Sequence, residues 1–344
     1  MRVGLLTGGG DCPGLNAVIR AVVRTGASRY GHEHLGILHG WRGILEAGET
    51  RPLDRGTVGG ILHLGGTILR SSRTNPYSRE GGPELVVENA KKLGLDALVA
   101  IGGEDTLGVA NRLHADFGFP VVGVPKTIDN DLSGTDYTFG FWTAVQIAVE
   151  AIDRLHTTAD SHDRVMVVEV MGRHAGWIAL ESGLAGGADA ILIPEVPTAV
   201  ERVAELINQR EAQGRHFSIV VVSEGVQFTD SEVDTTDLDE FGHVNLANID
   251  VGDYLARRIR ELTGKEARAV VLGHTQRGGT PLAFDRALAT RFGVHAADMV
   301  ASGSFGRMAA VRGDRVIDVP LAEAVGTLKT VPPELFRDAE PFLG

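Results

Sequence analysis

Cysteine is almost absent from this 344-residue sequence, which has Cys12 as its one thiol, and no apolar run is long enough to cross a bilayer. A single cysteine excludes an internal disulfide framework and is typical of a reducing compartment. A membrane-spanning helix needs about 20 consecutive apolar residues. The apolar start of the chain, residues 1–6, meets a glycine cluster at once and is too short for a signal peptide. We therefore expect a cytoplasmic protein with no membrane partner.

Basic residues are scarcer than acidic ones, with 33 Lys and Arg against 45 Asp and Glu and a formal net charge of −12. This balance argues against a nucleic-acid partner and against binding to an anionic membrane, but it leaves room for local basic pockets. The hydrophobic fraction of 43% and the charged fraction of 23% are typical of a globular protein with an ample core. At about 150 residues per domain, the length predicts two domains.

Glycine, in contrast, is abundant at 45 residues, and it gathers at the ends of short apolar runs. Runs without polar alternation are typical of strands buried on both faces of a parallel sheet. Such strands are predicted at residues 3–6, 97–101, 121–124, 165–170, 190–193, 219–222 and 269–272. Helices are predicted between them at residues 14–27, 83–92, 107–116, 139–157, 175–184, 199–213 and 282–301. This alternation indicates an α/β fold with doubly wound, mainly parallel sheets.

Two features of the sequence could suggest a metal site, but we do not expect a metal at either of them. The acidic segment 230–240 has Thr235 where an EF-hand loop needs a glycine, so we expect a solvated loop there. His32 and His34 have no third ligand near them in the sequence, and we interpret them as ordinary surface or edge residues.

Two glycine-containing segments follow predicted strands, where ligands bind in open α/β sheets. Gly9 and Gly10 lie in the first, residues 7–16, where backbone N–H groups and a helix N-terminus could hold a phosphate. A tight strand-to-helix turn would also explain these glycines. In the second, residues 101–106, Glu104 and Asp105 follow two glycines. These carboxylates could bind Mg²⁺, or simply favour the start of a helix.

A third segment after a strand, residues 125–131, brings acidic and basic groups together. Asp129 and Asp131 lie beside Lys126 and Thr127, so one carboxylate could act as a base while a charged neighbour biases its ionisation. A turn would explain Asp131 but leaves Lys126 and Thr127 unexplained.

Arginine and histidine side chains mark the ends of other predicted strands. Arg164 and Arg268 each open a strand, and the loops 171–174 and 273–279 close the same two strands, while Arg73 lies in a separate loop. Any one of these arginines is more often a surface ion pair. Because guanidinium groups suit phosphate oxygens, their joint placement indicates an anion-binding pocket.

Taken in order, five segments of this chain resemble the motifs of the ATP/pyrophosphate 6-phosphofructokinase family. They are residues 8–11, 102–105, 127–131, 171–173 and 273–279, and the likeness covers almost the whole chain. The resemblance implies phosphoryl transfer to O1 of fructose 6-phosphate, with Mg²⁺ as cofactor and fructose 1,6-bisphosphate as product.

The resemblance also implies the catalytic roles. Asp129 would take the proton of the attacking 1-hydroxyl, Asp131 would tune it, and Thr127 would hold the transferring phosphoryl group. Arg73 and Arg173 would offset the charge of the transition state.

Binding residues follow from the same resemblance. Those expected to bind the phosphoryl donor are Gly9, Gly10, Gly103, Asp105, Thr106 and Lys126, with Glu104 at the metal. Those expected to bind the sugar phosphate are Arg164, Met171, Gly172, Arg173, Glu224, Arg268, His274 and Arg277. Of these, Arg164 and Arg268 match arginines that reach the 6-phosphate from a neighbouring subunit. We therefore expect a homo-oligomer, dimer or tetramer, with shared active sites.

Asp105 and Lys126 bear on the identity of the phosphoryl donor, because ATP-using members of the family have glycine at both places. An aspartate there fills the volume that the α-phosphate of ATP needs, and a lysine adds a cation for the end of pyrophosphate. A charge pair at ~4 Å is worth ~1 kcal/mol in water and up to ~4 kcal/mol at an effective dielectric near 20, enough to shift donor preference about tenfold. The combination resembles pyrophosphate-dependent members. Glu104 replaces the aspartate usual at the magnesium position and keeps its charge.

The expected architecture is two domains with the active site in the cleft between them. Residues 1–140 plus 276–326 would bind the phosphoryl donor, and residues 141–275 plus 327–344 would bind most of the sugar phosphate. His156 stands where regulated bacterial members carry an effector-binding arginine, so allosteric control is not expected. Two alternatives stay open, namely ATP as the donor and a catalytically silent regulatory subunit that binds a phosphometabolite. Acceptance of sedoheptulose 7-phosphate also stays open.

Overall fold

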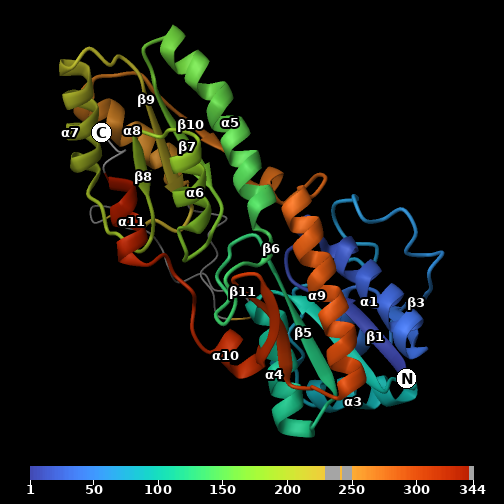
Figure 1. Cartoon of the computed structure of the whole chain (residues 1–344). Coiled ribbons are helices and arrows are strands. Elements are labelled where there is room, and N and C mark those ends of the chain that lie inside the picture. The colour runs from blue at the N-terminus through green and yellow to red at the C-terminus, as the bar shows by residue number, and fades with distance from the viewer. Residues whose placement is uncertain (229–240, 242–249, 341–344) are drawn as a thin grey trace.

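The computed structural model describes residues 1–228, 241 and 250–340, and the chain there forms two sheets flanked by helices (Figure 1). The acidic segment 230–240 lies outside the described residues. No helix in the described ranges has the length and apolar character to cross a membrane. The predicted fold class, α/β with mainly parallel sheets, is confirmed.

The larger sheet has eight strands in the order β12-β11-β5-β4-β1-β2-β3, with β6 paired to β5. Its strands are β1 (Arg2–Thr7), β2 (Glu33–Ile37), β3 (Thr50–Leu53), β4 (Ala97–Gly102), β5 (Val121–Thr127), β6 (Phe139–Gly140), β11 (Arg307–Arg312) and β12 (Arg315–Pro320). Only the outer pairs, β2 with β3 and β11 with β12, are antiparallel. The central strands β1, β4 and β5 are parallel, so their carboxyl ends share one edge of the sheet.

Helices cover both faces of the larger sheet. On one face α1 (Leu15–Tyr30) packs along α9 (Ala283–Ser302), which Figure 1 shows in blue and orange. On the other face lie α2 (Gly40–Leu45), α3 (Gly82–Lys92), α4 (Glu104–Phe117) and α10 (Leu321–Val325). Alternate side chains of β1 serve the two cores, since Leu5 belongs to the first and Leu6 to the second.

The smaller sheet has four parallel strands in the order β10-β7-β9-β8. They are β7 (Val165–Val170), β8 (Ala190–Leu192), β9 (Ser218–Ser223) and β10 (Ala267–Val271). One face carries α5 (Phe141–Ser161) and α6 (Trp177–Ala185), and the other carries α7 (Val200–Ala212) and α8 (Val251–Thr263). The chain ends, within the described range, in α11 (Pro333–Ala339), which contacts α6.

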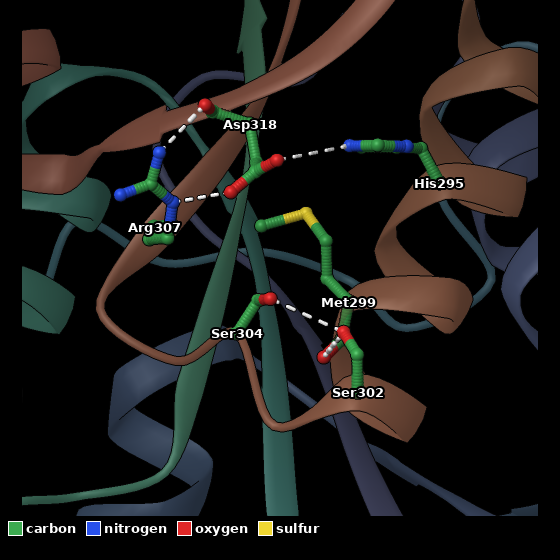
Figure 2. Close-up of polar contacts among 6 residues, drawn as sticks. All are labelled: His295, Met299, Ser302, Ser304, Arg307 and Asp318. Carbon is green, nitrogen blue, oxygen red and sulfur yellow. Dashed lines mark hydrogen bonds and ion pairs between the residues drawn. The ribbon is translucent and has the colours of Figure 1, made fainter.

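The hairpin of β11 and β12 closes one side of the larger sheet and is tied to α9 (Figure 2). Arg307 donates through Nε to the Asp318 carboxylate and through Nη2 to the Asp318 carbonyl oxygen at 2.9 Å. His295 of α9 places Nε2 3.8 Å from Asp318 Oδ1. Arg307 is in register with Val122 at the amino end of β5, so this cluster lies at the edge opposite the strand ends that bind ligands.

All seven predicted strands occur, but several elements differ from the sequence-based expectation. The helix predicted from residue 139 begins at Phe141, because Phe139 and Gly140 pair with β5 as β6. Strands β2, β3, β11 and β12, and helix α8, were not predicted. His32 and His34 are buried against α1 and are not surface residues, so that interpretation is wrong.

Candidate active site

The glycine-rich and polar loops that follow β1, β4 and β5 meet in one pocket. Thr7 is in register with Ile101, and Gly102 with Pro125, so the three strands end at the same level. The pocket is lined by Gly9, Gly10, Asp11, Arg73, Gly103, Glu104, Asp105, Thr106, Lys126, Thr127, Ile128, Asp129, Asp131, Arg173 and Arg277. Every residue expected to act in catalysis, to bind the phosphoryl donor or to bind metal lies in this set.

The loop after β1 needs glycine for two separate reasons. Gly9 has φ 77°, in the left-handed region that disfavours side chains. A Cβ at Gly10 would collide with the guanidinium of Arg277. Glycine at these positions therefore lets the cationic ends of Arg277 and Lys126, which suit phosphate oxygens, lie close to the loop backbone.

Lys126 lies at the end of β5 with its ammonium group in the pocket. It is 4% exposed, and Nζ donates to the carbonyl oxygen of Gly10. Burial lowers the pKa of Lys126 from its ordinary value. This hydrogen bond fixes the cation beside the glycine loop.

Thr127, Asp129 and Asp131 form the carboxylate centre of the pocket. The Thr127 hydroxyl donates to Asp129 Oδ2 at 3.2 Å and accepts from the Asp129 N–H at 3.1 Å. Oδ1 of Asp129 and Oδ1 of Asp131 are buried and have no hydrogen-bond partner in the described part of the chain. Burial, and then the charge of Asp129, raise the pKa of Asp131 to about 7. Two carboxylate oxygens are thus open to a proton or a cation.

Glu104 and Asp105 occupy the first turn of α4, and both line the pocket. Acidic residues are favourable there because a helix N-terminus carries partial positive charge. The helix therefore begins three residues before the predicted residue 107. Their place in the first turn agrees with the helix-start interpretation, and both also line the pocket, while Mg²⁺ binding stays a prediction.

Three arginines, Arg73, Arg173 and Arg277, contribute to the same lining. Arg277 is 8% exposed, and its Nε lies 3.5 Å from the sulfur of Met171. With Lys126 they bring four positive side chains to a pocket that also holds carboxylates. Such a mixed lining suits a phosphate group bound together with a divalent cation.

The residues expected to contact the sugar lie beside this pocket, at the ends of β7 and β9. Glu224 Oε1 accepts from the N–H groups of Gly172 at 3.4 Å and Arg173 at 3.2 Å. Burial raises the pKa of Glu224. The N–H of Met171 donates to Gln276 Oε1 at 2.9 Å, so the loops after β7, β9 and β10 are held together. His274, in η3 (Gly273–Arg277), is exposed.

Arg164 and Arg268 do not join the pocket. Both pair with Glu266, Arg164 at 3.0 Å and Arg268 at 2.7 Å, at the amino ends of β7 and β10. Because a strand rises about 3.3 Å per residue, Arg164 lies roughly 20 Å from Met171 at the other end of β7. One chain by itself cannot bring these arginines to the pocket.

No group of three or more His, Cys, Asp and Glu side chains within the described ranges could hold a metal by itself. Magnesium does not need such a cage, since it commonly takes one or two carboxylates together with substrate phosphates and water. Glu104, which lines the pocket together with side chains that suit phosphate oxygens, fits that mode of binding.

Comparison with known proteins places this site in a family. Residues 2–300 match the sequence profile described as phosphofructokinase. The chain belongs to the phosphofructokinase family. The pyrophosphate–fructose 6-phosphate 1-phosphotransferase of Streptomyces coelicolor is 60% identical over 346 residues, covering 100% of both chains. The ATP-dependent 6-phosphofructokinase 3 of the same organism is 52% identical over 348 residues, again covering 100% of both.

The fold agrees with that of solved phosphofructokinases. The pyrophosphate-dependent phosphofructokinase from Marinobacter aquaeolei superposes with a TM-score of 0.80 at 26% identity, covering 97% of this chain and 86% of that one. The names of relatives of this chain thus specify pyrophosphate in one case and ATP in another. The names of relatives therefore do not identify the donor of this chain, and the residues of the pocket have to be considered.

Some lining and supporting residues were missing from the sequence-based set. Asp11 lies in the first glycine motif and Gln276 in the last, so the signal for them was present. The N–H of Lys329 donates to the Asp131 carbonyl oxygen at 2.9 Å. No sequence motif marked Lys329, because it lies far from Asp131 along the chain.

Proposed function

We propose that this chain transfers a phosphoryl group from pyrophosphate to O1 of fructose 6-phosphate, giving fructose 1,6-bisphosphate and phosphate. The observation that carries this proposal is that Asp105 and Lys126 line the same pocket as Asp129. A full-length relative at 60% identity bears the name of this activity. The first alternative is the same reaction with ATP, which is supported by a relative at 52% identity that is named as ATP-dependent.

The geometry around Lys126 favours a short phosphoryl donor. The ammonium group is fixed against Gly10, where it would attract the charged end of pyrophosphate. Asp105, in the first turn of α4, would occupy space and add negative charge where ATP carries its α-phosphate. A pyrophosphate group ends before that place, so it would avoid the clash.

In the proposed reaction Asp129 accepts the proton of the 1-hydroxyl through its free Oδ1. Asp131, with its raised pKa, holds a proton at neutral pH more readily than an ordinary aspartate, which keeps the pair from carrying two full charges. Thr127 holds Asp129 in place and binds the transferring phosphoryl group. Arg73 and Arg173 offset the negative charge that develops on the phosphoryl oxygens.

Mg²⁺ is the proposed cofactor. Glu104 would hold it together with the phosphates of the donor. When bound, the ion supplies positive charge to the phosphate oxygens.

For the sugar phosphate, we propose that Met171, Gly172, Arg173 and Glu224 bind the sugar and that His274 and Arg277 bind the 6-phosphate. Arg164 and Arg268, which lie at the far end of the smaller sheet, would serve the site of a neighbouring subunit in a homo-oligomer. The domain division at residues 1–140 plus 276–326 and 141–275 plus 327–344 is proposed with it. The first sheet falls in the former and the second sheet in the latter.

We also propose a cytoplasmic location and a place in glycolysis, where phosphorylated sugars are interconverted. The buried thiol of Cys12 fits a reducing compartment.

A parallel assay of the purified protein tests the function. With fructose 6-phosphate and Mg²⁺, pyrophosphate should support turnover and ATP should support little or none. The reverse reaction with phosphate should also run, because the two phosphoryl bonds differ little in transfer energy. Turnover with ATP alone would establish the first alternative. Binding of fructose 6-phosphate with no turnover from either donor would establish a regulatory subunit.

A further inference from the structure

Arg70 has a backbone conformation that its side chain makes costly. Its φ is 57°, in the left-handed region that glycine adopts freely and arginine does not. Two hydrogen bonds hold it there, from the Thr7 hydroxyl to the Arg70 carbonyl oxygen at 2.6 Å and from the Arg70 N–H to Thr67 at 3.3 Å. Strain of this kind persists where the surrounding structure fixes it, and it gathers at functional sites.

The loop that carries Arg70 is anchored to the glycine loop of the active site. The N–H of Gly9 donates to the Ser72 carbonyl oxygen at 3.0 Å, and the Ser71 hydroxyl donates to the Gly9 carbonyl oxygen at 2.5 Å. The Ser72 hydroxyl also donates to the carbonyl oxygen of His39 at 2.7 Å. Arg70 therefore has a fixed position relative to the donor pocket.

A second pocket opens beside the donor pocket, and Arg70 lines it. The two pockets share Gly9, Gly10, Asp11 and Arg73, so they adjoin along the glycine loop. The Arg70 side chain is exposed, and its guanidinium makes no hydrogen bond or ion pair with any residue that the structure describes. The lining of this pocket includes two guanidinium groups, of Arg70 and Arg73, and the carboxylate of Asp11, within a chain of net charge −12.

We propose that Arg70 binds the phosphate group of pyrophosphate that is not transferred, and free phosphate when the reaction runs backwards. The proposal rests on the proposed function and adds a residue that the family motifs did not indicate. A terminal phosphate carries more charge than a phosphate inside a nucleotide chain, so a guanidinium here favours pyrophosphate over ATP. Arg70 keeps its strained backbone where it lines the second pocket, next to the glycine loop that both pockets share.

Arg70→Gly separates binding from folding, because it removes the guanidinium and relieves the backbone. The melting temperature should stay the same or rise. The KM for pyrophosphate, and the KM for phosphate in reverse, should rise about tenfold, the loss expected for one charge-assisted hydrogen bond. The KM for fructose 6-phosphate should stay within about twofold. Calorimetric titration with pyrophosphate and Mg²⁺ should show the same weakening without turnover.

Three further variants isolate the charge. Arg70→Met keeps the length and the strained backbone but loses the charge, and it should match Arg70→Gly in KM. Arg70→Lys keeps the charge and should lie between them and the wild type. Ala47→Gly, at an exposed residue with φ 49° that lines neither pocket, relieves a similar strain and should leave every KM unchanged.

Two results would count against the proposal and can be told apart. If the wild type uses pyrophosphate but Arg70→Gly and Arg70→Met bind it within about twofold of the wild type, the role of Arg70 is wrong and the proposed function stands. If the wild type neither turns over nor binds pyrophosphate, the proposed function fails and the role of Arg70 fails with it.

Discussion

At the scale of single residues, the pocket is a balance of buried charges, and the pair Asp129 and Asp131 is its centre. Asp129 is held by Thr127, and each aspartate leaves one oxygen without a partner in the described chain. An unpartnered buried carboxylate oxygen is costly to folding. The chain keeps two of them side by side, which is expected where a ligand completes the site.

Replacing the proposed base tests its role directly. Asp129→Asn should lower kcat by ~10² to 10⁴, the range for loss of a general base, while the affinity for fructose 6-phosphate changes little. Steady-state kinetics with a binding titration would measure both. Asp11→Asn removes another carboxylate from the same lining and should cost far less. Activity of Asp129→Asn within a few-fold of the wild type would contradict the assignment.

Asp131 should give stability a pH dependence of a defined sign. Its folded-state pKa of about 7 is above its ordinary value of 3.8, so the folded state binds the proton more tightly. Stability contributed by this group is therefore lost as pH rises from about 4 to about 7. Asp131→Asn cannot ionise, so its melting temperature relative to the wild type should rise across that window and level off above it. Thermal melts at pH 4 to 8 measure the difference, and a constant difference would contradict the raised pKa.

The donor preference depends on two further residues of the pocket. Asp105→Gly should relieve the clash with a nucleotide and raise turnover with ATP, whereas Lys126→Gly should mainly weaken turnover with pyrophosphate. The double variant should exceed the sum of the two, because groups that line one pocket couple. Ratios of kcat/KM for the two donors measure the change. An unaltered ratio in Asp105→Gly would show that this carboxylate does not select the donor.

At the scale of elements, the sequence predicts the strands that build the site better than those at the edges. Residues 97–101 and 121–124 are apolar without interruption because β4 and β5 are covered on both faces. Strand β12 lies at the exposed edge and carries Arg315 and Asp318, so its pattern gives no such signal. Strand β11 has only the short apolar run 308–311 between two arginines. The sequence therefore predicts that the motif loops follow the central strands. Because these strands are parallel, their carboxyl ends share one edge of the sheet, and the loops meet there in one pocket.

The C-terminal segment shows what sequence patterns do not contain. Lys329 donates its N–H to Asp131 and its Nζ to the Asp136 carbonyl oxygen at 2.6 Å, and its own carbonyl oxygen accepts from Trp177 of α6 at 2.9 Å. Val331 continues the segment by donating to Glu195 at 2.8 Å. These contacts tie the loop of the active-site carboxylates to the smaller sheet. They are long-range, and no periodicity or motif marks them.

Removing the Lys329 ammonium should loosen this connection. Lys329→Met keeps the aliphatic stem but removes the hydrogen bond to the exposed Asp136 carbonyl oxygen, so the free energy of unfolding should fall by about 0.5–1.5 kcal/mol. We also expect kcat to fall several-fold, because the backbone of Asp131 is held by the same segment. Urea denaturation and initial rates measure the two effects. Lys91→Met, on the exposed face of α3, is the matched control and should change neither.

At the scale of the whole molecule, the motifs alone do not show which of the two sheets supplies each residue of the site. The carboxyl ends of both sheets supply the pocket and its surroundings, with Arg173 after β7 and Asp129 after β5. The family and fold class are confirmed, while the roles of individual site residues and the domain boundaries stay predictions. Arg164 and Arg268 show why, since in a single chain both pair with Glu266 at the amino ends of β7 and β10, away from the pocket.

If the sites are shared between chains, two inactive variants should restore each other. A chain with Asp129→Ser lacks the base but keeps Arg268, and a chain with Arg268→Ala keeps the base. In a symmetric pair of one copy of each, the site built on Asp129 of the second chain receives the intact Arg268 of the first. The other site of that pair lacks both groups. Random mixing should therefore recover up to about a quarter of the wild-type activity.

The experiment mixes the two purified variants and follows turnover with pyrophosphate over time, with differently tagged chains to measure subunit exchange by co-purification. Activity should rise as mixed oligomers form. Asp129→Ser mixed with Asp129→Asn is the control, because every site of that mixture lacks the base and none should recover. Within one chain, Arg164 and Arg268 pair with Glu266 at the end of the sheet away from their own pocket. A return of activity would therefore have to come from the arginines of the neighbouring chain. Exchange without any return of activity would mean that these arginines serve no neighbouring site and that the pocket of each chain binds its substrates without them.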